Sequence, residues 1–341
     1  MDSRYLKNLE LRRLVEKIET ASSILLTTHK QCDGDGLGAM LGLYHALRKL
    51  DKKVRVITVD GVPAKYRFLQ PELHLQNFDK PHDPIEPTDL CLIFDTNDRR
   101  LVDPLFFELE KQCKQIAFVD HHPVLNKGPE PTPGSYIDTS AASTGEIAFF
   151  IIKALGIRMD QMIARALYTS IAFDTQIFRY VKNSPSSHLI AAELLEHEKN
   201  AYSVHRFLFA TYTQEKIAFL GKVLSEVEYF AEGQVAVVKV SLSDLKDHDL
   251  DMDDSRDVID MIMNINALQV AALFREDAPN EYKLSLRSKG SIEVLGIAES
   301  FGGGGHMFAS GAPLQGQYED LKLKLVNQFL KRLNGTTKAK S

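Results

Sequence analysis

The sequence predicts an α/β protein with two domains, because of its length, its alternating pattern and a change of pattern near residue 185. The chain has 341 residues, which is too long for one ordinary domain. Short apolar runs alternate with helical periodicity, as is typical of a mostly parallel sheet covered by helices. We therefore expect an N-terminal α/β domain over 1–185, a helical linker over 186–230, a smaller α/β domain over 231–335 and a tail over 336–341.

The expected N-terminal domain alternates helices with apolar, β-prone strands. Ser143 and Glu146 fit a capping box at the start of one helix. Apolar periodicity predicts helices at 3–20, 37–50, 101–113, 143–155 and 160–172, and strands at 23–28, 53–59, 90–94 and 115–119.

The C-terminal part begins with a long helical stretch and then returns to alternation. Its pattern predicts helices at 186–198, 204–230, 255–264, 292–300 and 317–333, and strands at 234–241, 269–275 and 281–287. The last residues, 336–341, are expected to fray.

Composition excludes several classes of function. The net charge is −5 and the pI is near 6.1, which argues against tight, non-specific binding to long DNA or RNA. A small phosphorylated ligand remains compatible with this charge. Three cysteines without a CxxC pair predict no disulfide framework and a cytoplasmic protein. No apolar run approaches about 18 residues, so we expect no membrane span.

Ionisable residues follow three of the predicted strands. His29, Asp95 and Asp120 each come directly after an apolar run. In an open α/β sheet, ligands bind outside the carboxyl ends of the strands. These three side chains are therefore expected at one edge of the sheet.

Further candidate metal ligands lie beside these strand ends. Asp33 and Asp35 flank a glycine in a tight turn, and His121 and His122 follow Asp120. Asp174 is expected near the C-terminal end of a helix, where an acid needs a compensating partner. Taken alone, the turn at Asp33 and Asp35 is better explained by a solvated turn, and Asp95 is equally well explained as a loop residue. Two adjacent histidines after an acid, by contrast, are less well explained as structural residues. Together they predict a two-metal site whose ligands suit Mn²⁺, or alternatively Mg²⁺.

The order of these motifs resembles the DHH phosphoesterase superfamily with its DHH-associated C-terminal domain. The pattern is HxxxDGD, a later Asp, DHHP, another Asp and, far downstream, GGGGH, over roughly residues 15–315. By size, the chain is most similar to the nanoRNase and pAp-phosphatase group, where pAp is 3′-phosphoadenosine 5′-phosphate. The resemblance implies hydrolysis of short RNA oligonucleotides, of dinucleotides such as pApA, or of pAp, by a homodimer that uses two divalent metal ions.

The resemblance also implies roles for the N-terminal residues. Asp95 would bridge the two ions, Asp120 would orient a neighbouring histidine, and His122 would face the scissile phosphate and act in catalysis. The first ion would be held by His29, Asp33 and Asp95, and the second by Asp35, Asp95, His121 and Asp174.

The C-terminal motifs imply a substrate-binding site. Arg287 and Ser285 lie in an SLRS sequence like that of the family, in which the arginine holds a terminal phosphate. Glycines leave backbone N–H groups open to a ligand. The implied substrate-binding residues are Ser285, Arg287, Gly303, Gly304, Gly305 and His306.

Several alternatives stay open. The motifs do not separate a nanoRNase from a phosphodiesterase of cyclic dinucleotides such as cyclic di-AMP. A non-catalytic nucleotide sensor and an ordinary α/β protein with structural acids are rivals of another class. The GGGGH ending argues against a family II inorganic pyrophosphatase. The chain also departs from the family at Cys32 (usually Pro), Gly36 (often Ala), Ala39 (often Ser) and Gln176 (often Gly).

Overall fold

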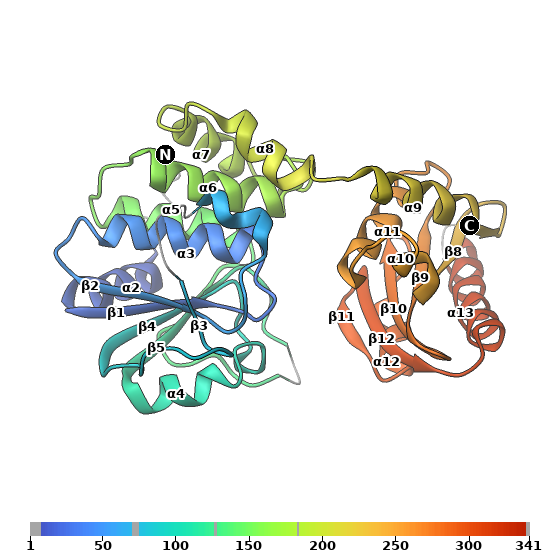
Figure 1. Ribbon diagram of the computed structural model, residues 1–341, viewed down its shortest axis with the longest axis horizontal. Helices are drawn as coiled ribbons and strands as arrows, with labels where there is room; N and C mark the ends of the chain where they lie inside the picture. Colours follow the sequence, from blue (N-terminus) through green and yellow to red (C-terminus); the bar gives the residue numbers. More distant parts are fainter. Residues whose placement is uncertain (1–7, 70–74, 126–127, 183, 339–341) are drawn as a thin grey trace. The chain divides into compact units, whose positions relative to one another are not determined.

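The computed structural model describes residues 8–69, 75–125, 128–182 and 184–338. The chain forms two compact units that divide after Thr211, and each contains its own six-stranded sheet (Figure 1). The prediction of two α/β domains is therefore confirmed. The stretch 186–230, expected to be a linker, is shared between the units, because its first two helices pack on the N-terminal unit and its third on the C-terminal unit.

The N-terminal sheet is parallel throughout, in the order β3-β2-β1-β4-β5-β6. Ile24 of β1 is in register with Val54 of β2 on one side and with Leu90 of β4 on the other. The strand order therefore reverses at β1, and a ligand site is expected at the carboxyl ends of β1 and β4. The strands are β1 (Ser23–Thr28), β2 (Lys53–Thr58), β3 (Gln76–Asn77), β4 (Thr88–Phe94), β5 (Cys113–Asp120) and β6 (Tyr136–Ile137).

Helices cover both faces of this sheet. Ile24 and Leu26 of β1 pack into the core beneath α3, α5 and α6, whereas the intervening Leu25 packs toward α4. The first layer comprises α2 (Leu9–Thr20), α3 (Gly34–Leu47), α5 (Thr144–Ala154) and α6 (Gln161–Asp174), with α7 (Ser186–Leu195) and α8 (Ala201–Phe209) beside it and α4 (Leu105–Gln112) on the other face (Figure 1).

The start of α3 differs from the prediction in a way that matters for the site. We expected a helix from residue 37, but α3 begins at Gly34. The side chain of Asp33 caps it by accepting hydrogen bonds from the backbone N–H groups of Asp35 and Gly36. Asp35 therefore lies in the first helical turn, where its charge is favourable. Residues 3–7 of the first predicted helix lie outside the described residues.

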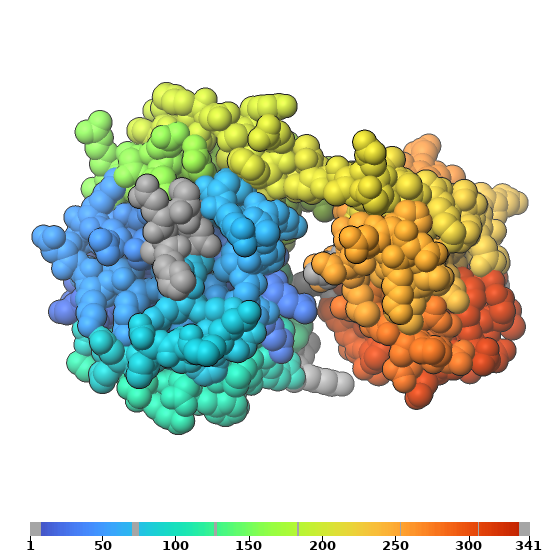
Figure 2. Space-filling model, viewed as in Figure 1, coloured from blue at the N-terminus to red at the C-terminus, as the bar shows by residue number. Residues whose placement is uncertain are grey.

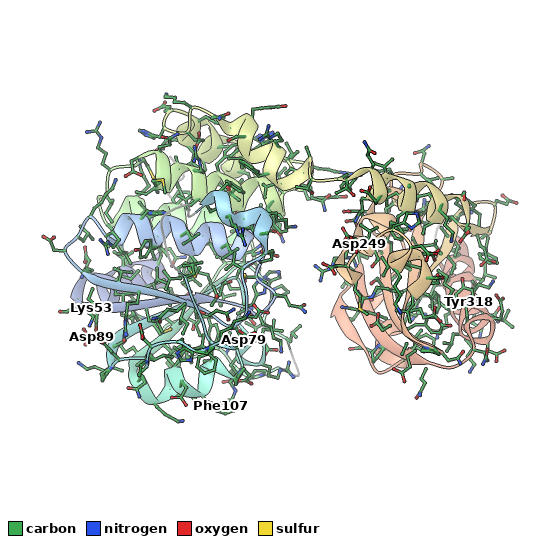
Figure 3. The ribbon with its side chains drawn as sticks, in the orientation of Figure 1. Lys53, Asp79, Asp89, Phe107, Asp249 and Tyr318 are labelled. Carbon is green, nitrogen blue, oxygen red and sulfur yellow. The ribbon has the colours of Figure 1, made fainter. Side chains whose placement is uncertain are left out.

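The edge of the sheet opposite the strand ends is held by Asp89. Its carboxylate accepts hydrogen bonds from the backbone N–H groups of Ser22 and Ser23 and from Lys114. Lys53 and Asp89, both near strand beginnings, mark this edge in Figure 3. The charged residues Asp89 and Lys114 thus hold this edge of the sheet together.

The C-terminal sheet is mixed and has the order β11-β12-β10-β9-β8-β7. Only β8 and β9 pair in parallel. The single helix expected over 204–230 is wrong in two respects. It is divided into two helices, at Ala201–Phe209 and Gln214–Ser225, and Glu228 pairs with Val237 and begins a strand. The strands are β7 (Glu228–Phe230), β8 (Val235–Val240), β9 (Val270–Ala278), β10 (Glu281–Ser288), β11 (Gly304–His306) and β12 (Ala309–Gln315).

Two sets of helices cover this second sheet. One face is covered by α9, α10 and α11, and in the space-filling view the orange atoms of α10 and α11 cover the near side of the unit (Figure 2). The last helix extends over residues 336–338, which were expected to fray. The helices are α9 (Gln214–Ser225), α10 (Leu242–Lys246), α11 (Arg256–Ile262), α12 (Leu295–Ser300) and α13 (Tyr318–Lys338).

Within the described parts of the chain, no helix is both long and apolar enough to cross a membrane.

Candidate metal centre

The predicted metal ligands of the N-terminal unit meet at the strand ends. His29 follows β1, Asp95 follows β4, and Asp120 is the last residue of β5. Asp174 is the last residue of α6 and reaches the same place. The structure groups these residues into three overlapping sets of possible metal ligands: His29 with Asp33 and Asp95; Asp35 with His121 and Asp174; and Asp95 with Asp120, His121 and His122.

The first set surrounds Nε2 of His29. This atom lies 3.9 Å from Oδ1 of Asp33 and 3.5 Å from Oδ2 of Asp95. The other ring nitrogen, Nδ1, lies 2.8 Å from the carbonyl oxygen of Lys30. Because a carbonyl only accepts hydrogen bonds, Nδ1 carries the proton in the neutral ring and Nε2 is left with a lone pair for an ion.

The second set surrounds Nε2 of His121. This atom lies 3.4 Å from Oδ2 of Asp35, 3.7 Å from Oδ1 of Asp95 and 3.5 Å from Oδ2 of Asp174. Both ring nitrogens of His121 are buried and have no hydrogen-bond partner among the described residues. A buried nitrogen without a partner that faces three carboxylates fits a metal ligand.

Asp95 belongs to both sets, because Oδ2 faces His29 and Oδ1 faces His121. Atoms bound to one ion at about 2.1 Å lie about 3.0–3.5 Å apart at ordinary coordination angles. The observed separations of 3.4 to 3.9 Å are close to that range. The residues present therefore fit two adjacent divalent ions that share one carboxylate.

The N-terminus of α5 holds two of these carboxylates. The backbone N–H groups of Thr144 and Gly145 donate to Asp35 over 2.9 and 3.2 Å, and the hydroxyl of Ser170 donates to it as well. The hydroxyl of Thr144 donates to Oδ1 of Asp95 over 3.0 Å. Sequence reasoning missed these partners, although the capping pattern that begins at Ser143 marks the helix start that supplies them.

Asp120 orients His122. Its Oδ1 accepts hydrogen bonds of 2.8 Å from Nδ1 of His122 and from the backbone N–H of His121. Its Oδ2 accepts one of 2.7 Å from the side chain of Asn97, which also donates to the carbonyl of His122. Asp120 is fully buried, so both oxygens are fixed. Asn97 was also missed, and its only signal is its place two residues after Asp95.

The histidines have different proton affinities. Burial lowers the pKa of His29, but hydrogen bonds to Asp33 and Asp95 outweigh it and raise the pKa to about 11. Burial likewise opposes the charge of His122, and its hydrogen bond to Asp120 raises the pKa to about 9. Burial lowers the pKa of His121. Without an ion, protons therefore partly compensate the clustered carboxylates.

The carboxylates show the corresponding repulsion. Burial, followed by the charge of Asp35, raises the pKa of Asp174 to about 8. The same two causes raise the pKa of Asp95 well above its ordinary value. A divalent cation bound among them would favour their charged forms and release the protons.

Gly36 allows α3 to approach the strand ends closely. A Cβ atom at this position would lie 2.2 Å from Oγ1 of Thr28 and 3.2 Å from Cβ of Asp95. Oγ1 of Thr28 is itself held by a 3.0 Å hydrogen bond to the carbonyl of Phe94. The space at residue 36 is thus filled by a fixed hydroxyl group.

A left-handed turn follows Asp174. Gln176, Ile177 and Phe178 have φ angles of 46°, 57° and 64°, a conformation that is unfavourable for residues with side chains. The hydroxyl of Thr175 accepts a 2.9 Å hydrogen bond from the backbone N–H of Phe178. Residue 176 therefore has a left-handed backbone conformation although it is a glutamine and not a glycine.

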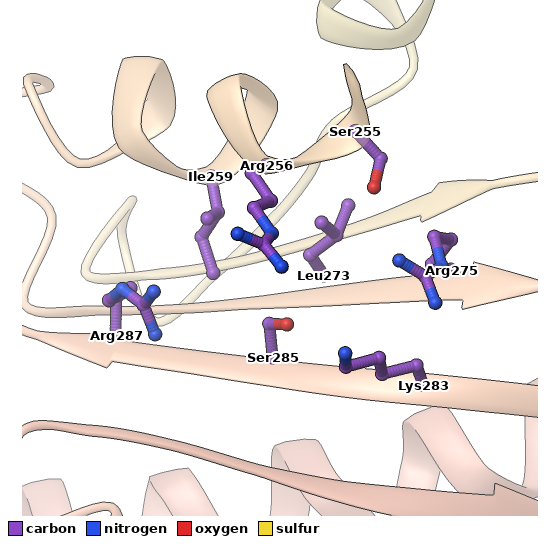
Figure 4. A pocket seen from close by; sticks show the side chains of 8 residues that line it. All are labelled: Ser255, Arg256, Ile259, Leu273, Arg275, Lys283, Ser285 and Arg287. Carbon is purple, nitrogen blue, oxygen red and sulfur yellow. The ribbon is translucent and has the colours of Figure 1, made fainter. Parts of the chain in front are cut away.

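The predicted substrate-binding residues lie in the C-terminal unit, on β10 and near β11. Ser285 and Arg287 line a pocket together with residues of α11, β9 and β10 (Figure 4). Ser285 pairs with Gly311 of β12, and Gly311 pairs with Gly304 of β11. The structure therefore brings these three segments together.

Close packing against β12 also requires glycine within this run. A Cβ atom at Gly303 would lie 2.0 Å from the carbonyl oxygen of Gly311, so only glycine fits there. Gly305 and His306 belong to β11, where His306 pairs with Ala309. The side chain of His306 lies outside the described residues.

Comparisons with known proteins identify the family of the chain. Residues 23–171 match the model of the DHH family, N-terminal domain, and residues 232–334 match the DHHA1 domain. The chain is 30% identical over 312 residues to the "Bifunctional oligoribonuclease and PAP phosphatase NrnA" of Thermus thermophilus. The matched region covers 90% of this chain and 89% of the relative. The chain belongs to the DHH phosphoesterase family. Within that family it falls in the group of NrnA-like proteins.

Two further proteins extend the similarity. The protein of the same name from Bacillus subtilis is 24% identical over 306 residues, with 88% of this chain and 92% of the relative covered. An exopolyphosphatase-related protein from Bacteroides fragilis has a crystal structure that matches with a TM-score of 0.85 and 25% identity, over 97% of this chain and 98% of the other. The similarity in fold thus extends over nearly the whole chain.

Proposed function

We propose that this phosphoesterase hydrolyses short RNA oligonucleotides, including dinucleotides such as pApA, and pAp, with the help of two divalent metal ions. The names of its NrnA relatives support the substrate class. The single observation that carries the two-metal proposal is Asp95, whose two carboxylate oxygens face separate sets of ligands.

The residues divide into two ligand sets in this proposal. His29, Asp33 and Asp95 hold one ion, and the other is held by Asp35, Asp95, His121 and Asp174. When bound, such a pair activates water as a nucleophile and stabilises charge on the phosphate oxygens. Mn²⁺ is our preferred candidate over Mg²⁺, because imidazole and carboxylate ligands are mixed.

His122 has a separate role in the proposal. It lies at the edge of the cluster, with Nδ1 bound to Asp120. Its raised pKa, about 9, keeps it charged near neutral pH, so it can stabilise a phosphate or donate a proton to a leaving oxygen. Asp120 acts through His122 by fixing its ring.

The C-terminal unit supplies binding rather than chemistry. Arg287 and Ser285 are proposed to hold a terminal phosphate, since arginine forms paired hydrogen bonds to phosphate and stays charged. Gly303, Gly304, Gly305 and His306 are proposed to complete this surface. The homodimer and the cytoplasmic location expected from the sequence stay predictions.

Product analysis with Mn²⁺ tests the proposal. The protein would be offered pApA, a five-residue RNA, pAp, cyclic di-AMP and pyrophosphate, next to Asp95→Asn and the control Asp79→Asn, an exposed acid outside the cluster. We expect hydrolysis of the linear substrates and pAp by the control but not by Asp95→Asn. Preferential opening of cyclic di-AMP would make cyclic dinucleotides the substrate class in place of short linear RNA. Binding without turnover of any compound would favour the nucleotide sensor.

A further inference from the structure

One strip of the C-terminal sheet is polar although a helix lies beside it. Lys283, Ser285 and Arg287 occupy alternate positions of β10 and share one face of that strand. The intervening Leu284 and Leu286 point into the core with α12 and α13. On the other face, the apolar core beneath α11 is formed with β8 and β9 and includes no described residue of β10. The polar row is therefore left at the border of that core.

This row forms one wall of a pocket whose opposite wall is α11. Arg256 points from α11 toward the strands, and the side chain of Lys283 points along β10 toward Ser285 (Figure 4). All charged residues that line the pocket are cations: Arg256, Arg275, Lys283 and Arg287. Positive groups that converge from two elements around a hydroxyl are typical of an anion site.

Nearby carboxylates neutralise only part of this charge. Asp277 holds Arg275 through hydrogen bonds of 2.6 and 3.0 Å, so Arg275 has a structural partner. Asp260 lies 4.0 Å from Nε of Arg287. Lys283 has no ion-pair partner in the part of the chain that the structure describes. It contributes a positive charge that the protein leaves available.

The position of Lys283 separates it from Arg287. The two residues are four positions apart on β10, so their Cα atoms are separated by about 13 Å along the strand. A ligand held by Arg287 at one end and by Lys283 at the other is longer than one phosphate group. We propose that this pocket binds a second phosphate group of a short oligonucleotide, with Lys283 and Arg256 as its cationic ligands, beside the terminal phosphate that Arg287 holds.

This inference rests on the proposed function, because that function supplies the phosphate at Arg287. It deepens that function, because the C-terminal unit would distinguish substrates by their length. A ligand with one free phosphate, such as AMP, uses Arg287 alone, whereas a 5′-phosphorylated trinucleotide also engages Lys283. The shared chemistry is two neighbouring phosphate groups, which inorganic tripolyphosphate also offers.

Metal-free binding isolates this pocket from the metal centre. Calorimetric titrations of the full chain in EDTA would use pApApA, AMP and tripolyphosphate as probes, with Lys283→Gln and Arg256→Gln. The matched control is Lys324→Gln, which removes the same charge from an exposed position of α13, on the opposite face of the sheet. Lys283→Arg keeps the charge and should bind as the unaltered protein does.

We expect Lys283→Gln to weaken pApApA binding about tenfold, the loss of roughly one charge-assisted hydrogen bond, and AMP binding by less than about twofold. The slope of log affinity against log salt should become shallower by about 0.7, which corresponds to one lost phosphate contact on a single strand. Loss of tripolyphosphate binding without loss of pApApA binding would overturn the oligonucleotide as the ligand of this pocket and would leave inorganic polyphosphate as the source of the two phosphate groups.

Equal losses for AMP and pApApA, or no loss for either, would overturn the second phosphate position, as would an effect of Lys324→Gln as large as that of Lys283→Gln. If Lys283→Gln binds pApApA normally while the unaltered protein hydrolyses pApA with Mn²⁺, the pocket inference fails and the proposed function stands. If the binding pattern holds but no linear substrate is hydrolysed, the proposed function fails and the pocket stands.

Discussion

The hydroxyl group of Thr144 donates a 3.0 Å hydrogen bond to Oδ1 of Asp95, the carboxylate that faces both sets of candidate metal ligands. The backbone N–H of the same residue donates to Asp35. One buried residue at the start of α5 therefore fixes two carboxylates, one just after β4 and one in the first turn of α3. Its removal should affect ion binding more than folding.

Thr144→Val tests this relationship, because it keeps the shape of the side chain and replaces the hydroxyl group with a methyl group that cannot donate a hydrogen bond. We expect Mn²⁺ affinity to fall by about tenfold or more, the usual cost of losing a partner of a metal ligand. Thr144→Ser keeps the hydroxyl and should retain affinity. Calorimetric Mn²⁺ titration measures both, and an unchanged affinity in Thr144→Val would show that Asp95 is held by other contacts.

Asp120→Asn should reduce turnover without removing a proposed metal ligand. The variant lacks the negative charge that holds the ring of His122 and that raises the pKa of His122 in the unaltered protein. We expect kcat on pApA to fall by about 100-fold, within the range for a displaced acid–base group, while Mn²⁺ affinity changes less. Asp98→Asn, which alters a carboxylate paired with Arg100, is the control. Equal kcat values for the two variants would remove Asp120 from the mechanism.

The stability of the metal-free protein should fall as pH rises from about 6.5 to 9. The pKa of His122 is raised to about 9, so its contribution is full below its unfolded value and is lost as pH rises through 9. Asp174 has a pKa of about 8, above that of an unfolded aspartate, so it acts in the same direction. Thermal unfolding in EDTA at several pH values measures this. His122→Gln should flatten the dependence, and stability that rises over this window would contradict the assignment.

Gln176→Gly should stabilise the fold by about 1 kcal/mol. Gln176 has a φ of 46°, a conformation that costs a residue with a side chain about 1–2 kcal/mol and costs glycine little, although glycine loses more entropy on folding. Urea unfolding provides the measurement. The same change in a helix, Gln112→Gly at the end of α4, should destabilise. A loss of stability in Gln176→Gly would mean that the glutamine side chain makes a compensating contact.

The ligand cluster could be predicted from the sequence because strand ends can be located from apolar runs. His29, Asp95 and Asp120 each follow such a run, and parallel strands place their carboxyl ends together. Thr144, Ser170 and Asn97 could not be predicted in the same way. They are short polar residues whose roles depend on hydrogen bonds to residues distant in the sequence.

The C-terminal unit contains the element that sequence reasoning missed most clearly. Strand β12 includes Gly311 and Pro313 and has none of the β-branched residues that favour strands. It forms because β10 on one side and β11 on the other supply hydrogen-bond partners. Its small residues are needed there, since Gly303, the residue before β11, approaches it closely. Tertiary pairing outweighed local propensity.

The contact between Gly36 and Thr28 constrains how the first motif can evolve. The Cβ atom of an alanine at position 36 would overlap with the Thr28 hydroxyl group at 2.2 Å on this backbone. The Thr28 side chain would have to move to admit an alanine at position 36, whereas a smaller residue at position 28 would leave room for it. The two positions therefore form an epistatic pair, in which the residue at position 28 determines which side chains position 36 can accept.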